Sequence, residues 1–233
     1  MIVGNGLIAK SLKNSSCNNS QTLIFASGVS NSSESSLTAF ERERILVEEY
    51  LAYSNQNNMI FVYFSSCALV DDRHLEIPYY RHKSNMEQII KKDANKFIII
   101  RLPQLIGKSE NKNTLINYLV EKIRTGESFQ LWKYATRYLI EVNDLRIIME
   151  SLVHERSLLN QRIDIANPYR YTVEEIVKDI SIYMNKKANY ILCDKEDSYL
   201  LNLELFLNFC KKKKLDIDFG KKYLSNKLKN IIE

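Results

Sequence analysis

Cysteine is scarce in this sequence, and the four cysteines are scattered along the chain. None of them has the short paired spacing that a zinc site needs, and together they do not form the framework of a small disulfide-rich domain. We therefore expect no metal site, and we expect a reducing, cytoplasmic environment. The four residues are Cys17, Cys67, Cys193 and Cys210.

Long apolar runs, internal repeats and glycine-serine linkers are missing as well. The N-terminus has no basic region followed by an apolar stretch, and no later run approaches the length of a membrane span. We expect neither export nor membrane insertion. A chain of 233 residues without linkers or repeats fits one α/β domain, or a core domain with a small appended lobe.

Charge of one sign is not strongly in excess. Lysine and arginine number 33 against 28 aspartates and glutamates, which gives a formal net charge of +5. This charge is too small and too dispersed to predict nucleic-acid binding, whereas an anionic small molecule is compatible with it. The lysine run 211–214 is most simply the solvated end of a helix.

Short apolar runs alternate with amphipathic stretches through the first half of the chain. In the first amphipathic stretch, the charged run 41–44 is expected on the polar face, opposite apolar residues at helical spacing. Strands that alternate with helices predict a parallel sheet covered on both faces. The strands are expected at 22–26, 59–64 and 97–102, and the helices at 37–54 and 79–91.

The pattern changes after Pro103. Thr172 is followed three residues later by Glu175, which is the spacing of a capping box at the start of a helix. These later elements predict a smaller lobe that is continuous with the rest of the chain. Helices are expected at 114–125, from 143 onward and at 171–184, and short strands at 129–132 and 138–142.

A glycine turn joins the first apolar residues to the first helix. Gly4 and Gly6 allow a backbone to approach an anion closely, and the helix that follows offers unpaired N–H groups. A tight strand-to-helix turn that needs glycine only for its backbone angles explains the pattern equally well. The pattern is weak alone, because Ala9 stands at the third glycine position.

Tyr79 and Lys83 are four residues apart at the start of a predicted helix, so their side chains share one face. An ammonium group near a phenol favours the phenolate and lowers the phenol pKa. Such a pair can move a proton during carbonyl or alcohol chemistry. The spacing alone occurs by chance in many helices, so the surrounding sequence has to decide.

Six segments of the chain, in order, resemble motifs of one family. This family is the extended short-chain dehydrogenase/reductases that act on nucleotide sugars as epimerases, dehydratases and reductases. The resemblance extends along most of the chain. The segments are GNGLIA (4–9), FASG (25–28), FSSCALV (64–70), YYRHK (79–83), RLPQLIG (101–107) and TRYLIEVND (136–144).

The resemblance implies a Rossmann-like parallel twisted sheet with a small C-terminal α/β substrate lobe. We expect residues 1–107 to form the cofactor-binding core, and residues 108–233 to hold the rest of the core and the lobe. The implied activity is NAD(P)-dependent hydride transfer on a nucleotide-linked sugar, as a keto-sugar reductase or an epimerase. The helices at 37–54 and 79–92 occupy the place of the family's dimer interface, which implies a homodimer.

The resemblance also assigns residues to a site. The implied catalytic residues are Tyr79, Lys83, Ser66 and Cys67. The residues implied to contact the substrate are Gln104 and Arg137, and the planar guanidinium of an arginine suits a diphosphate. The residues implied to bind NAD or NADP are Gly4, Asn5, Gly6, Leu7, Ile8, Ala26, Ser27, Gly28, Tyr79, Lys83 and Leu102.

Two side chains of this site have alternative interpretations. Cys67 stands where the family places a hydroxyl, and a thiol is a weaker hydrogen-bond donor, so Cys67 is alternatively a small buried residue. A dehydratase is disfavoured, because Cys67 and Ala68 replace the acidic neighbours that elimination needs. Arg137 is alternatively part of a surface salt bridge with Glu141 or Asp144.

The larger departure concerns the adenosine half of the cofactor site. About a dozen residues separate the first helix from the strand at 22–26, and we find neither the extra strand nor the acidic residue that binds the adenosine ribose. We expect this region to be truncated. A non-catalytic member of the fold that serves as a binding or scaffolding protein is therefore an alternative.

Overall fold

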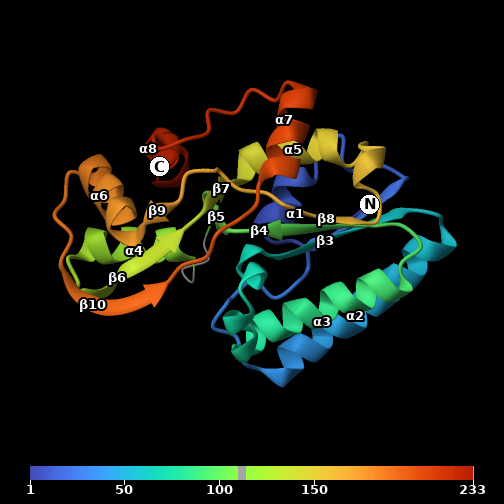
Figure 1. Ribbon diagram of the computed structural model, residues 1–233, viewed down its shortest axis with the longest axis horizontal. Helices are drawn as coiled ribbons and strands as arrows, with labels where there is room; N and C mark the ends of the chain where they lie inside the picture. Colours follow the sequence, from blue (N-terminus) through green and yellow to red (C-terminus); the bar gives the residue numbers. More distant parts are fainter. Residues whose placement is uncertain (110–113, 233) are drawn as a thin grey trace. The chain divides into compact units, whose positions relative to one another are not determined.

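The computed structural model describes residues 1–109 and 114–232, and its chain divides into two units (Figure 1). Residues 110–113 and 233, which belong to the expected second segment, lie outside the described residues. Unit 1 comprises Met1–Leu102, Val142–Ile165 and Leu201–Leu215. Unit 2 comprises the described parts of Pro103–Glu141, Ala166–Leu200 and the segment from Asp216 onward.

A parallel sheet organises unit 1, and it confirms the predicted fold class. Its middle strands are apolar and buried on both faces, which is typical of a sheet with helices on either side. The five strands among the described residues lie in the order β1-β2-β3-β4-β8. They are β1 (Ile2–Val3), β2 (Thr22–Phe25), β3 (Ile60–Ser66), β4 (Phe97–Leu102) and β8 (Gln161–Asp164).

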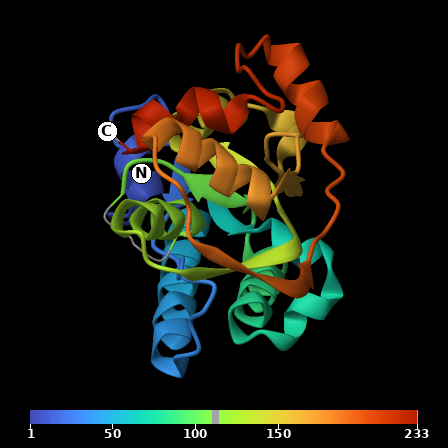
Figure 2. The ribbon, with the colours of Figure 1, turned by 90° about the vertical axis from the view of Figure 1, so that its left-hand side faces the viewer.

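Helices cover both faces of this sheet (Figure 1). Two long helices, α2 (Leu37–Gln56) and α3 (Pro78–Asp93), lie side by side on one face (Figure 2). On the other face lie α1 (Leu7–Leu12), α5 (Val142–Leu152) and α7 (Glu204–Lys213). Three short 3-10 helices complete the unit: Cys67–Val70, Asp72–Glu76 and Arg156–Leu158.

Local sequence explains where the two long helices begin. The hydroxyl of Ser36 accepts a hydrogen bond from Ala39 N and caps the first turn of α2. Pro78 occupies the first turn of α3, where a residue without an N–H group leaves no hydrogen bond unmade.

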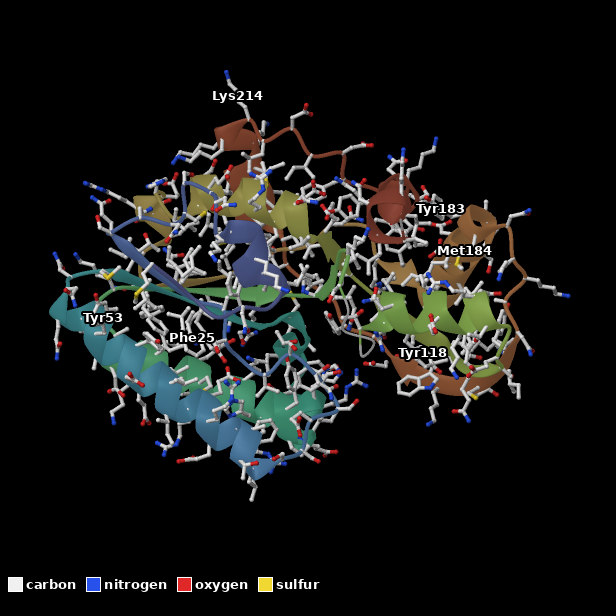
Figure 3. All side chains as sticks on the ribbon, turned by 180° about the vertical axis from the view of Figure 1, so that it is seen from behind. Phe25, Tyr53, Tyr118, Tyr183, Met184 and Lys214 are labelled. Atoms are coloured by element: carbon white, nitrogen blue, oxygen red, sulfur yellow. The ribbon has the colours of Figure 1, made fainter. Side chains whose placement is uncertain are left out.

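An aromatic cluster fills the core between the sheet and these helices. Phe25 lies there, on the side of α2 (Figure 3). Its ring is 6.0 Å from the ring of Phe61 and 6.2 Å from those of Tyr50 and Tyr63, measured between centroids. Burial of such large apolar surfaces is the main force that attaches α2 to the sheet.

The predicted truncation is visible at the edge of the sheet. Strand β1 pairs directly with β2 and has no strand on its other side, among the described residues. All residues from 4 to 21 are described, and none of them is in a strand. The strand on which the adenosine half of a dinucleotide would rest is therefore missing from this stretch.

Unit 2 has its own small sheets. In the described chain, β10 (Tyr190–Asp197) is parallel to β6 (Phe129–Arg137), and β9 (Tyr171–Thr172) is antiparallel to it. Strand β5 (Gln104–Ile106) pairs in parallel with β7 (Leu139–Glu141). The helices of this unit are α4 (Leu115–Thr125), α6 (Val173–Met184) and α8 (Tyr223–Ile232).

The capping box predicted for α6 is present, since Thr172 and Glu175 exchange hydrogen bonds between side chain and backbone. The helix begins at Val173, directly after the two-residue strand β9. This strand occupies the first two residues of the range 171–184 that was expected to be helical. None of the described helices is long and apolar enough to cross a membrane.

Candidate functional site

Tyr79 and Lys83 lie on the same face of α3, and both side chains are buried. The ammonium nitrogen of Lys83 is 5.8 Å from the centre of the Tyr79 ring. The structure therefore brings together the two residues that the sequence analysis proposed as a pair. Their environment, however, differs from the one expected.

A buried carboxylate on α2 holds the ammonium group of Lys83. Glu43 Oε1 lies 2.9 Å from Lys83 Nζ, and the two side chains are 0% and 3% exposed. Lys83 Nζ also donates to the hydroxyl of Tyr63, at 3.1 Å. The expected position of Glu43 on the polar face of its helix is thus wrong, because this carboxylate points inward to meet a buried charge.

The carboxylate of Glu43 accepts hydrogen bonds from several elements. Its Oε1 accepts from the Tyr63 hydroxyl on β3, at 2.6 Å, and its Oε2 accepts from the backbone N–H of Val29, also at 2.6 Å. His82 Nε2 lies 3.1 Å from Oε2, but its geometry does not make a hydrogen bond. His82 instead stacks on Phe40, with 4.6 Å between ring centroids.

This arrangement changes the electrostatics of the pair. Burial would raise the pKa of Glu43, but the Lys83 charge and the hydrogen bonds that Glu43 accepts hold it well below its usual range. Burial raises the pKa of Tyr79, and Tyr80 and Glu43 raise it further. The net lowering of the Tyr79 pKa that was expected from Lys83 is not found, because burial raises this pKa and Glu43 balances the ammonium charge.

The loop after β2 packs directly on the ion pair. A Cβ on Gly28 would lie 2.7 Å from Glu43 Oε1 and 2.8 Å from Lys83 Nζ, so a larger residue would require the loop or the ion pair to shift. Ala26 and Ser27, in the same loop, are half-buried. The Gly28 loop therefore covers the ammonium group that the resemblance assigns to the cofactor.

The glycine turn has two different halves. Gly4 has φ +120°, and a Cβ there would be 2.3 Å from the carbonyl oxygen of Ala26, so position 4 requires glycine for backbone reasons. Around Gly6 no atom lies within 4 Å of the place of a Cβ, and no side chain caps helix α1. Open space beside uncapped N–H groups fits a phosphate.

The other residues assigned to this turn lie around that open space. Asn5 is exposed, and Leu7 and Ile8 are half-buried in the first turn of α1. A pyrophosphate group therefore fits the turn, whereas the missing strand beyond β1 leaves the adenosine half without a wall.

At the end of β3, the hydroxyl groups of Ser65 and Ser66 and the thiol of the following Cys67 have different surroundings. Ser65 donates to Glu87 at 2.7 Å, and the Ser66 hydroxyl accepts from Ala68 N at 3.3 Å in a half-buried position. Cys67 is fully buried and donates to the carbonyl oxygen of Arg101, at 3.2 Å. Burial raises the pKa of the Cys67 thiol well above its ordinary value. This placement suits a small buried residue and leaves Ser66 as the more accessible group.

A second buried ion pair fixes the end of β4. Arg101 Nε donates to Glu87 Oε1 at 2.7 Å, and Arg101 Nη2 donates to Glu87 Oε2 at 3.0 Å. A bidentate pair of this kind links α3 to β4 through two hydrogen bonds of defined geometry. Leu102, the last residue of β4, follows Arg101 in the sequence and is also buried.

The two residues assigned to the substrate, Gln104 and Arg137, lie in unit 2. Gln104 is half-buried at the start of β5. Arg137 ends β6, and its guanidinium pairs with Asp197 of β10, with 2.5 Å from Nη2 to Oδ2 and 2.8 Å from Nη1 to the carbonyl oxygen. The alternative partners Glu141 and Asp144 are therefore wrong, and the salt bridge reaches a strand that the sequence analysis did not predict.

A parallel sheet with a glycine turn after its first strand defines a Rossmann-like domain. The chain belongs to the NAD dependent epimerase/dehydratase family, which matches residues 15–160 and thus begins after the glycine turn. No curated protein matches the sequence. This match confirms the prediction that the chain belongs to this family, and with it the prediction that the chain belongs to a family of enzymes.

Solved structures support the fold. A UDP-glucuronic acid 4-epimerase from Bacillus cereus, in complex with UDP-glucuronic acid and NAD, has a TM-score of 0.74 at 11% identity, over 91% of this chain and 74% of that one. A dTDP-glucose 4,6-dehydratase from Bacillus anthracis with NAD has a TM-score of 0.69 at 14% identity, over 90% and 71%. RMD from Pseudomonas aeruginosa with NADPH has a TM-score of 0.69 at 12% identity, over 90% and 80%.

Proposed function

We propose that this protein is an NAD(P)-dependent oxidoreductase that acts on a nucleotide-linked sugar, as a keto-sugar reductase or an epimerase. The observation that carries the proposal is the buried Tyr79 and Lys83 pair on one face of α3. The family and the nucleotides bound in the similar structures support the same class of chemistry. A phenol that is fixed by its surroundings is suited to proton transfer at a sugar carbon.

The residues around the glycine turn would hold the cofactor. Its pyrophosphate would lie on Gly4, Asn5, Gly6, Leu7 and Ile8, since the space beside Gly6 is open. When bound, the cofactor supplies or accepts the hydride. The residues that would line its nicotinamide end are Ala26, Ser27, Gly28, Tyr79, Lys83 and Leu102. The proposed cofactor is NAD or NADP, since the truncated edge of the sheet lacks the strand whose end would distinguish the two.

Ser66 and Tyr79 would contact the oxygen of the reacting sugar carbon, with Cys67 as a buried neighbour of Ser66. The Ser66 hydroxyl polarises the carbonyl, and Tyr79 gives or takes the proton. In unit 2, Arg137 would bind the diphosphate of the substrate, and Gln104 would contact its sugar. Arg137 would then exchange the carboxylate oxygen and the backbone carbonyl oxygen of Asp197 for two oxygens of a phosphate group.

The test is turnover of a keto-sugar nucleotide by Tyr79→Phe and by the unaltered protein, with each reduced nicotinamide cofactor. The variant retains the ring and loses only the hydroxyl, so the fold is preserved. We expect a loss of about a hundredfold or more, which is the usual contribution of a positioned acid or base. Equal rates would remove Tyr79 from the chemistry.

A non-catalytic binding or scaffolding role is the second candidate. The observation that favours it is the position of the Gly28 loop and Glu43 on the Lys83 ammonium group, which leaves a cofactor ribose only the space beside them. Calorimetric titration with NAD, NADH, NADP and NADPH decides between the candidates. Binding of none of these four molecules favours the non-catalytic role.

We further propose a homodimer through the outer face of α2 and α3. A groove of about 1340 Å³ runs between these helices, and Phe40, Ile45 and Met86 are among its lining residues. Leu37 is 82% exposed and Ile45 is 50% exposed there, so a second copy packed on this groove would bury apolar surface. Light scattering that gives the mass of one chain would contradict this proposal.

A further inference from the structure

Four elements converge on the carboxylate of Glu43. They are the loop after β2, through Val29 N; β3, through Tyr63; α3, through Lys83; and α2, which carries Glu43 itself. His82 Nε2, also on α3, lies 3.1 Å from the carboxylate without a hydrogen bond. Hydrogen bonds from Val29 N, Tyr63 and Lys83 to one buried carboxylate indicate a fixed position, because the loss of any of them would leave a buried charge poorly compensated. The carboxylate of Glu43 is thus fixed against the ammonium of Lys83.

The charged and titratable groups around Tyr79 decide its protonation. On its own helix, Lys83 Nζ is 5.8 Å from its ring centre, and the Tyr80 ring contacts it edge-on at 5.0 Å. His74, from the preceding 3-10 helix, packs on Tyr80 at 5.1 Å. From α2, the Glu43 carboxylate acts on Tyr79 in the direction opposite to Lys83.

A lone ammonium group at this distance would favour the phenolate. Here the ammonium is only one half of a pair, since Glu43 lies 2.9 Å from it and both side chains are buried. Tyr63 hydrogen-bonds to both members of the pair, and its hydroxyl adds no net charge. The net charge that Tyr79 experiences from the pair is therefore close to zero, and burial then favours the neutral phenol.

We propose that Glu43 is a positioning residue, which neutralises Lys83 and keeps Tyr79 as a protonated phenol, so that the site donates a proton to a substrate carbonyl. This inference rests on the proposed function, and it selects a keto sugar as the substrate class. Reduction of a nucleotide-linked keto sugar is then the favoured reaction. Epimerisation, which must begin by taking a proton from an alcohol, is disfavoured.

Reduction adds one hydride and one proton to the carbonyl group of the keto sugar. The carbonyl carbon of the keto sugar gains a hydride from a reduced nicotinamide dinucleotide, which is oxidised, and the C=O double bond becomes a single bond. The carbonyl oxygen takes the phenolic proton of Tyr79, which yields an alcohol. The Tyr79 phenolate then regains a proton from solvent. The reverse reaction starts from the phenolate, the form that the Glu43 and Lys83 pair does not stabilise.

The experiment is a pH titration of Tyr79 in the full-length protein, without cofactor. Isotope-labelled tyrosine reports each phenol by NMR, and Tyr79→Phe assigns the signal. In the unaltered protein we expect Tyr79 to titrate above the ordinary tyrosine value of about 10. Titration at or below that value would overturn the proposal, whether or not any variant folds.

Three variants isolate the role of Glu43. In Glu43→Gln the ammonium is no longer balanced, and the Tyr79 pKa falls by about one unit or more. In Glu43→Gln with Lys83→Met both charges are absent, and the Tyr79 pKa stays high. Glu41→Gln, a carboxylate on the exposed side of the same helix that pairs with Arg44, leaves it unchanged. A folded Glu43→Gln protein with an unaltered Tyr79 titration would also overturn the proposal.

Rates in both directions complete the test. Keto-sugar reduction is expected to proceed at neutral pH, and oxidation of the product alcohol is expected to rise tenfold per pH unit below the Tyr79 pKa. In Glu43→Gln the oxidation profile shifts to lower pH with the phenol, which a merely structural role would not produce. Absence of turnover in both directions would contradict the proposed function, while the NMR titration still decides the role of Glu43.

Discussion

Glu43 on α2 and Lys83 on α3 form a buried ion pair, with 2.9 Å between Oε1 and Nζ, although 40 residues separate them in the chain. The pair joins two helices that otherwise meet through apolar side chains and the groove on their outer face. It lies beneath the Gly28 loop and beside Tyr79. A change in this pair should therefore affect both the stability of unit 1 and the protonation of Tyr79 in the candidate site.

The first prediction concerns the stability that depends on this pair. Lys83→Met leaves the Glu43 carboxylate buried without its counter-ion, and we expect the free energy of unfolding to fall by about 3–5 kcal/mol. The double variant with Glu43→Gln removes both charges and should be the more stable of the two. Urea unfolding of the single and double variants measures the coupling, and Glu41→Gln is the exposed control. A single variant as stable as the unaltered protein would contradict the prediction.

The second prediction concerns the two glycines with opposite surroundings. Gly28→Ala places a Cβ 2.7 Å from Glu43 Oε1 and 2.8 Å from Lys83 Nζ, so the loop or the pair must shift. We expect a loss of about 1–3 kcal/mol, as for other overpacked positions. Gly6→Ala is the matched control, because no atom lies within 4 Å of its Cβ position and its φ of −74° suits alanine. Thermal unfolding that ranks the two variants in the reverse order would refute the packing described for this loop.

The third prediction concerns stability in acid. Burial would raise the pKa of Glu87, but hydrogen bonds from Arg101 lower it, and the pKa of Glu43 is lowered for a similar reason. As the pH falls, the carboxylates of Glu43 and Glu87 therefore take up protons at a higher pH in the unfolded chain than in the folded protein. Stability should be complete above the unfolded carboxyl value of about 4.3, and should be lost as pH falls below it.

At alkaline pH the stability should change in the opposite direction and fall as the pH rises. Burial raises the pKa values of Tyr63 and Tyr79, so the folded protein keeps phenolic protons that the unfolded chain releases. Stability should be present below about pH 10 and should be lost as pH rises above it. Urea midpoints from acid to alkaline pH measure both limits. A midpoint that is constant below pH 4 would show that Glu43 and Glu87 are not paired as described.

Much of unit 1 was predictable from the sequence, because its inner strands are apolar runs. Expected strands at 22–26, 59–64 and 97–102 correspond to Thr22–Phe25, Ile60–Ser66 and Phe97–Leu102. Strand β8, Gln161–Asp164, was missed, because only Ile163 in it is buried and its neighbours are polar. Strand β10, Tyr190–Asp197, was missed for the same reason, since its side chains are largely exposed.

The site was predictable only in part. The spacing of Tyr79 and Lys83 indicated that they share a face, but no local pattern showed that Glu43 would reach Lys83, since this contact depends on how two helices pack. A weak signal did exist: Glu43 precedes Val47 and Leu51 at intervals of four, and these three residues form the buried side of α2. A charged residue on an apolar helical stripe indicates a buried partner elsewhere in the chain.

The last prediction concerns the guanidinium of Arg137, which the proposed function assigns to the substrate diphosphate. Asp197 now accepts its hydrogen bonds, so phosphate and carboxylate compete for the same donors. Asp197→Asn removes the competing charge and should tighten binding of a nucleoside diphosphate several-fold, whereas Arg137→Ala should weaken it with the fold intact.

Asp194→Asn is the matched control for this prediction. Asp194 lies on the same strand and approaches Lys133 at 3.7 Å on an exposed surface, where ion pairs contribute little. Calorimetric titration of the three variants with a nucleoside diphosphate measures the effect, and circular dichroism checks the fold. If Arg137→Ala and the unaltered protein bind equally well, then Arg137 serves only to attach β10 to β6, and the diphosphate must bind elsewhere.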